Sequence, residues 1–212
     1  MTVVDPAVAS RVPGRGEAVT PSRADRAWTI GGAAVLVGGC ALLAARPAIA
    51  AAGPAPVVSF SVLFAALLAV GATWPLPPAP ASAPASAPAF ATSTTVAVLL
   101  GVGAFAIGRA VGGGHAPMAP TLAIVVTNTL AALAEEAFFR RLCFGLLAPA
   151  GVAWAVVGSS LLFAVVHVTT YGLWVLPLDL AAGLVLGWQR AATGSWRAPA
   201  ITHVLVNLLV VL

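Results

Sequence analysis

The sequence predicts an all-α protein, a polytopic transmembrane helical bundle of about seven spans. Two observations carry this prediction. Of the 212 residues, 60% are hydrophobic and only 8% are charged, whereas a soluble domain usually carries about 25% charged residues. The apolar residues also gather in runs close to the ~20 residues that a helix needs to cross the hydrocarbon core of a bilayer.

The N-terminal part of the chain predicts three regions that carry no interpretable motif. They are a disordered cytoplasmic tail at residues 1–26, a two-helix membrane unit at 27–74 with spans at 27–45 and 57–74, and a linker rich in Pro, Ala and Ser at 75–90.

The remaining residues, 91–212, predict a second membrane domain. Its expected spans are residues 91–108, 120–147, 152–168, 174–188 and 198–212. All six tryptophans fall near the ends of predicted spans or in adjoining loops, as in the aromatic belts of membrane proteins.

The placement of the arginines predicts the orientation. The ten basic residues are all arginine and form no basic stripe, which argues against nucleic-acid binding. With a cytoplasmic N-terminus, only Arg46 and Arg109 fall on the far side of the membrane. Since positive charge favours the cytoplasmic side, we expect a multi-pass protein of the plasma membrane with its N-terminus in the cytoplasm.

Two adjacent carboxylates, Glu135 and Glu136, stand in the apolar run of the fourth predicted span. Ionisable groups there are costly and usually functional, although a charge cluster near the lipid headgroups is the alternative. Glu136 and Arg140 are four residues apart on one helix face, which suits a supporting ion pair. Glu135 points about 100° away from Glu136, without a partner on its own helix, which suits a general base or acid.

Three polar side chains of later spans accompany this pair. They are His167 in the fifth span, and His203 and Asn207, four residues apart on one face of the seventh. Residue 151, in the turn between the fourth and fifth spans, is the midpoint between Glu135 and His167. An antiparallel hairpin should therefore bring these two side chains to one level.

The position of His203 is less consistent with this picture. It lies five residues into the last predicted span, so counting places it roughly 15 Å lower than His167. A helix that begins earlier, or a turn at residues 194–196 that dips into the membrane, would remove the difference.

These residue types suit hydrolysis of a peptide bond. If Glu135, His167, His203 and Asn207 converge, they supply a base for water and donors for an oxyanion. Glu135, His167 and His203 could instead hold a zinc ion that activates the water. Taken singly, each histidine could also be a buried residue that is hydrogen-bonded within the bundle.

Three motifs, one in each of three spans, resemble the CPBP intramembrane proteases, also called the CAAX protease and bacteriocin-processing or Abi family. They read Glu135-Glu136-Ala-Phe-Phe-Arg140, Phe163-Ala-Val-Val-His167 and His203-Val-Leu-Val-Asn207. The resemblance covers roughly residues 118–212.

The resemblance implies an endopeptidase that cuts a membrane-embedded or lipid-anchored peptide, with prenylated CAAX proteins as the eukaryotic substrates. By the same resemblance, Glu135 and His167 would activate water, and His203 and Asn207 would stabilise the oxyanion. The family is described as metalloproteases, so zinc is the implied cofactor, although these residues also suffice without a metal ion.

Asp179 lies in the sixth predicted span outside these motifs, and we expect it to be an interfacial or helix-pairing residue. Two other functions compete with proteolysis. One is a non-catalytic membrane module that binds or protects a partner, as in bacteriocin immunity. The other is a small proton-coupled carrier, since buried Glu and His can relay protons.

Overall fold

The computed structural model describes residues 23–52, 55–76, 92–111 and 121–211, and their regular secondary structure is entirely helical. The predicted all-α class is therefore confirmed. The predicted tail up to residue 22 and the predicted linker from residue 77 onward lie outside the described residues.

Each predicted span corresponds to one helix or to one helical run. In chain order the elements are α1 (Arg23–Ala44), α2 (Arg46–Ala52), α3 (Pro56–Thr73), α4 (Thr94–Val111), α5 (Leu122–Glu136), the π-helical turn η2 (Ala137–Cys143), α6 (Phe144–Leu147), the 3-10 turn η3 (Ala148–Ala150), α7 (Val152–Tyr171), the 3-10 turn η4 (Leu173–Val175), α8 (Leu176–Thr193) and α9 (Arg197–Val211).

The predicted number of about seven membrane crossings is not confirmed. Four helical segments of the described chain are long and apolar enough to cross a bilayer, namely α3, α4, the run from Leu122 to Ala150, and α7. A fifth crossing results if the bent pair α1 and α2 counts as one. α8 carries Asp179, Gln189 and Arg190 and is less apolar than a span is expected to be. α9 is described over 15 residues.

The first span differs from the prediction at its C-terminal end. A helix ending at Ala45 was expected, but the chain continues as α2 after a bend of 55°. Pro47 follows the bend directly. A proline ring removes one backbone hydrogen bond and clashes with the carbonyl four residues earlier, which accounts for the break.

Local sequence signals account for several helix ends. The side chain of Thr121 accepts a hydrogen bond from the backbone N–H of Ile124 and caps α5. The turn between η3 and α7 passes through Gly151 with φ of 121°, a conformation that glycine adopts without strain. α8 begins with a proline in its first turn and ends at Gly194 in the left-handed conformation.

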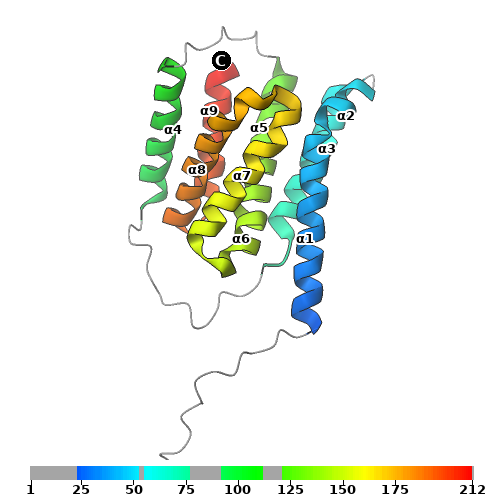
Figure 1. Cartoon of the computed structure of the whole chain (residues 1–212). Helices are drawn as coiled ribbons and strands as arrows, with labels where there is room; N and C mark the ends of the chain where they lie inside the picture. The colour runs from blue at the N-terminus through cyan, green and yellow to red at the C-terminus, as the bar shows by residue number, and fades with distance from the viewer. Residues whose placement is uncertain (1–22, 53–54, 77–91, 112–120, 212) are drawn as a thin grey trace, which may run out of the picture.

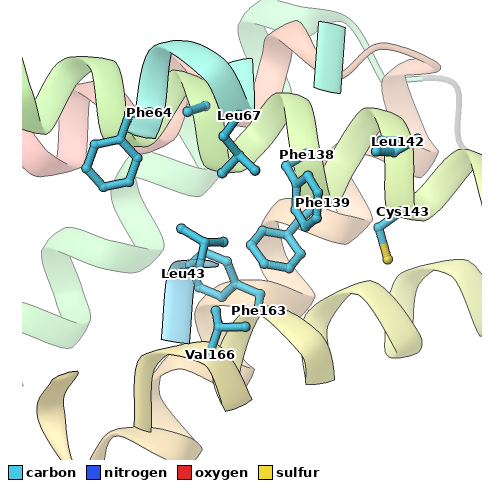
Figure 2. Packing of buried hydrophobic residues seen from close by; sticks show 10 residues of the cluster. Leu43, Phe64, Leu67, Phe138, Phe139, Leu142, Cys143, Phe163 and Val166 are labelled. Carbon is cyan, nitrogen blue, oxygen red and sulfur yellow. The ribbon is translucent and has the colours of Figure 1, made fainter. Parts of the chain in front are cut away.

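The helices form one bundle in which α5, α7, α8 and α9 lie together, with α1 to α3 on one flank and α4 on the other (Figure 1). Its apolar core joins α1, α3, η2 and α7 around a cluster of aromatic rings (Figure 2). Phe139 packs edge-on against Phe138 and Phe163, at ring-centre distances of 5.1 and 5.5 Å. This core fixes η2, which follows the two adjacent glutamates, against the N-terminal helices.

The closest approach of α3 to this core is at Gly71. A Cβ atom added there would lie 2.7 Å from the backbone carbonyl carbon of Ala137 and 2.8 Å from the backbone nitrogen of Phe138. Arg141 strengthens the same contact, because its guanidinium donates hydrogen bonds to the carbonyl oxygens of Gly71 and Trp74 at 2.7 and 3.1 Å. The N-terminal helices are thus bound closely to the rest of the bundle.

We expect Gly71→Ala to destabilise the protein, because backbone atoms of η2 cannot move aside as a flexible side chain can. Overpacking of this kind costs about 1–3 kcal/mol, against a gain of about 1 kcal/mol in helix propensity. The matched control is Gly38→Ala in α1, where an added Cβ meets nothing within 4 Å. Thermal unfolding in detergent should show a lower midpoint for Gly71→Ala only; equal midpoints for the two variants would contradict the close approach.

Candidate active site

The two adjacent glutamates lie at the junction of α5 and η2, and both are buried. The π-helical turn begins directly after Glu136 and also carries Arg140. A π-helical turn contains more residues per turn than an α-helix, so it redirects the side chains that follow, and such turns are frequent at functional sites. The local backbone thus departs from a regular helix where the charged residues concentrate.

Glu136 is held by two cationic or polar side chains. Its Oε2 lies 3.4 Å from Nε of Arg140, and both side chains are fully buried. Its Oε1 lies 3.0 Å from Nδ1 of His203 on α9. Arg140 also donates from Nη2 to the carbonyl of Gly183 at 3.3 Å and packs over the ring of Phe163. Glu136 and Arg140 together therefore link η2, α8 and α9, and the arginine compensates the charge of the glutamate.

Glu135 has different partners on different helices. Its Oε1 lies 3.2 Å from Nη1 of Arg46, at the start of α2, and 3.8 Å from Nε2 of His167 on α7. The structure therefore brings Glu135 and His167 to one level, as the count from residue 151 predicts. A separation of 3.8 Å exceeds a direct hydrogen bond but allows one water molecule to contact both groups.

The contact of Nδ1 determines the tautomer of His167. Nδ1 lies 2.7 Å from the carbonyl oxygen of Phe163, and a carbonyl can only accept, so Nδ1 carries a hydrogen. In neutral histidine, Nε2 then has a free lone pair directed at the Glu135 side. Asp179 lies 3.5 Å from Nδ1 as well, so a second carboxylate contacts this imidazole.

These side chains line one cavity of about 700 Å³. Its polar lining comes from α2, α5, α7, α8 and α9 and comprises Arg46, Thr127, Asn128, Glu135, His167, Thr170, Asp179, His203 and Asn207. Aromatic side chains, Phe60, Phe64, Phe105, Phe163, Tyr171 and Trp174, provide much of the rest. A mostly apolar cavity with a few convergent polar groups is typical of a binding or active site.

The predicted difference in depth between His203 and His167 does not occur. The ring of His203 lies 6.0 Å from the ring of Phe163, one turn from His167. α9 begins only one residue earlier than expected, which is too little to explain the shift. Instead, Nε of Arg190 near the end of α8 donates to the carbonyl of Arg140 at 3.0 Å. The turn between α8 and α9 therefore lies within the depth of the bundle.

Sequence reasoning missed two charged residues of this cavity. Arg46 was expected at a span end on the far side of the membrane, yet it is 8% exposed and contacts Glu135. Asp179 was expected at an interface or helix pair, yet it lines the cavity beside His167. Two signals in the sequence could have indicated these residues. Arg46 precedes a proline inside an apolar run, and Asp179 is a carboxylate in an apolar segment.

The predicted metal ligands do not gather into one set. In the part of the chain that the structure describes, no three His, Cys, Asp or Glu side chains are arranged to hold a metal ion. Glu135 and His167 lie close together, whereas Nδ1 of His203 engages Glu136. In the described residues these three side chains are thus not arranged as a ready set of ligands, and zinc stays a prediction.

Comparison with known protein families identifies the C-terminal part of the chain. The model for Rce1-like proteins, the type II CAAX prenyl endopeptidases, matches residues 117–209. This region is an Rce1-like domain of the CAAX protease family. No curated protein and no solved structure matches the chain.

The Rce1-like domain contains eight of the nine charged and polar residues named above as lining the cavity. Arg46 lies outside the matched range. The cavity of this chain is therefore built from the Rce1-like domain and from the N-terminal helices together.

Proposed function

We propose that this protein is an intramembrane endopeptidase that hydrolyses a peptide bond of a membrane-embedded or lipid-anchored, CAAX-type substrate. The observation that carries the proposal is the pairing of Glu135 with His167, 3.8 Å apart in a cavity among apolar helices. Membership of the CAAX protease family supports the same class of activity. The substrate would reach the cavity from the lipid bilayer, by passing between helices.

In this mechanism Glu135 and His167 hold and activate the attacking water. The water oxygen bonds to the scissile carbonyl carbon while one of its protons passes to the Glu135 carboxylate. The carbonyl π electrons move to oxygen and form an oxyanion. The C–N bond then breaks, and the proton held by Glu135 passes to the leaving amine. Atoms and charge balance without a further reactant.

His203 and Asn207 are assigned to the oxyanion. Both line the cavity, one turn apart on α9. Because Glu136 accepts a hydrogen bond from Nδ1 of His203, that ring is oriented with Nε2 left for the cavity. Glu136 and Arg140 then act as a supporting ion pair that orients the histidine, as a carboxylate orients the imidazole in other hydrolases.

We expect Glu135→Gln and His167→Ala each to lower kcat by roughly 10²- to 10⁴-fold, the usual contribution of a general base. Cleavage of a farnesylated CAAX peptide by the purified full chain in liposomes measures this. Arg197→Ala, at an exposed position at the start of α9, is the control and should leave kcat unchanged.

Wild-type cleavage by the double variant would overturn the peptidase proposal. The two competing functions, a non-catalytic module that binds or protects a partner and a proton-coupled carrier, both predict that the wild-type protein cleaves nothing. The same assay therefore separates proteolysis from either alternative.

We also propose that the reaction proceeds without a zinc ion bound by Glu135, His167 and His203. The support is the arrangement of the side chains, since no three His, Cys, Asp or Glu residues in the described ranges are placed to hold a metal ion together. Protein dialysed against a chelator should therefore keep its activity, with the metal content measured by elemental analysis. The opposite result would be a loss of cleavage after dialysis, followed by recovery as added Zn²⁺ binds to the protein. That result would show that the metal is required.

For the location we propose a multi-pass protein of the plasma membrane with a cytoplasmic N-terminus. The distribution of the arginines supports this side, since four of the ten, Arg11, Arg15, Arg23 and Arg26, lie before or at the start of the first apolar helix. A tag fused to Met1 should be digested by protease added to inverted membrane vesicles. Protection of the tag in inverted vesicles, with digestion in intact spheroplasts, would reverse the orientation.

A further inference from the structure

Arg46 has one guanidinium nitrogen that the protein leaves without a partner. Nε donates to the carbonyl of Leu43 at 3.0 Å, and Nη1 donates to Oε1 of Glu135 at 3.2 Å. Nη2 is buried and has no hydrogen-bond partner. The whole side chain is only 10% exposed. A buried donor of this kind calls for an explanation, and a bound ligand is one.

Two further buried atoms in the same cavity lack hydrogen-bond partners. They are Oγ1 of Thr127 on α5 and Oδ2 of Asp179 on α8, which lies 3.5 Å from Nδ1 of His167 without forming a hydrogen bond. The three atoms belong to three different elements that line one space. A donor on Arg46 and an acceptor on Asp179 complement a group that itself carries both an acceptor and a donor. A peptide backbone is such a group, with its carbonyl and its N–H.

We propose that Arg46 is a catalytic residue whose Nη2 donates a hydrogen bond to the scissile carbonyl oxygen and stabilises the oxyanion. This inference rests on the proposed peptidase function. Arg46 lies outside the Rce1-like domain, so the N-terminal helices would contribute directly to the reaction.

The geometry of the guanidinium favours this role. Its two terminal nitrogens belong to one rigid planar fork. Nη1 is fixed on the carboxylate of Glu135, so the rigid fork holds Nη2 close to the carboxylate that would bind the attacking water. An arginine that only held Glu135 in place would need Nη1 alone, and the contact to Leu43 already orients the side chain. A hydrogen bond from Nη2 to the substrate carbonyl oxygen would explain why Nη2 has no partner within the protein.

The charge of Arg46 would act most strongly after the attack. As the new C–O bond forms, the water proton passes to Glu135 and the carbonyl electron pair moves to oxygen. The base thereby loses its negative charge while the oxyanion gains one, beside the same cation. Arg46 thus exchanges one anionic partner for another during the step, and a preorganised donor stabilises the developing charge.

The test compares Arg46→Met and Arg46→Lys with the wild-type full chain in liposomes. We expect Arg46→Met to lower kcat by about 10²- to 10³-fold, as for the loss of one oxyanion donor, with KM unchanged. Arg46→Lys should recover part of the loss, because lysine keeps the charge but not the planar fork. Arg197→Ala serves again as the control.

A second readout separates the chemical role from a structural one. The probe is a phosphinate analogue of the farnesylated peptide, in which a tetrahedral anion replaces the scissile amide. Arg46→Met should lose affinity for the phosphinate by the same factor as kcat. Its affinity for the parent peptide, measured in the Glu135→Gln background so that cleavage does not interfere, should not change.

Each contrary outcome identifies what fails. Wild-type kcat in folded Arg46→Met, with Glu135→Gln inactive, overturns the role of Arg46 and leaves the peptidase standing. An equal loss of affinity for phosphinate and parent peptide makes Arg46 a binding or structural residue. Wild-type cleavage by Glu135→Gln overturns the peptidase itself. If thermal unfolding shows Arg46→Met to be unfolded, Arg46→Lys decides: reduced kcat at unchanged KM supports the role, and wild-type kcat contradicts it.

Discussion

The burial of two adjacent carboxylates among apolar helices is the constraint on which the rest of this structure depends. Neither could remain ionised there without a cation, because the desolvation of a charge in the interior is large. The chain meets this demand from opposite directions. Glu136 is compensated by Arg140 and contacted by His203 on the α8 and α9 side, and Glu135 is compensated by Arg46 on the α1 and α2 side. The ion pairs therefore determine which helices must surround α5.

The two glutamates differ in burial and in their partners, and the proposed mechanism gives them different roles. Glu136 is fully buried and tied to side chains of its own and neighbouring helices, as befits a residue that orients others. Glu135 borders the cavity and faces His167 across a gap that one water can fill. The π-helical turn and the close contact of Gly71 with its backbone hold this arrangement in place. In the proposed mechanism one dipeptide thus supplies a supporting group and a reactive group.

Much of this could be predicted from the sequence, because apolar runs locate helices and unusual polar residues within them locate the site. The seven helical ranges and the level of Glu135 with His167 follow from such local patterns. The number of crossings and the depth of His203 do not, because they depend on how α8 and α9 pack and on where their turn lies. Arg46 was assigned to a span end, since the 55° bend that carries it into the cavity arises from Pro47 and tertiary contacts. The position of Asp179 beside His167 could not be predicted, because Asp179 belongs to no motif in the sequence.

The level of the turn between α8 and α9 has a consequence for the supply of the second reactant. The turn follows Arg190, whose Nε reaches the carbonyl of Arg140 just beyond the two glutamates. Non-helical backbone at such a level is tolerated where it is buried in protein or lines a water-filled space. A turn placed there would shorten the path that water has to cover to the buried imidazoles, which the proposed hydrolysis requires.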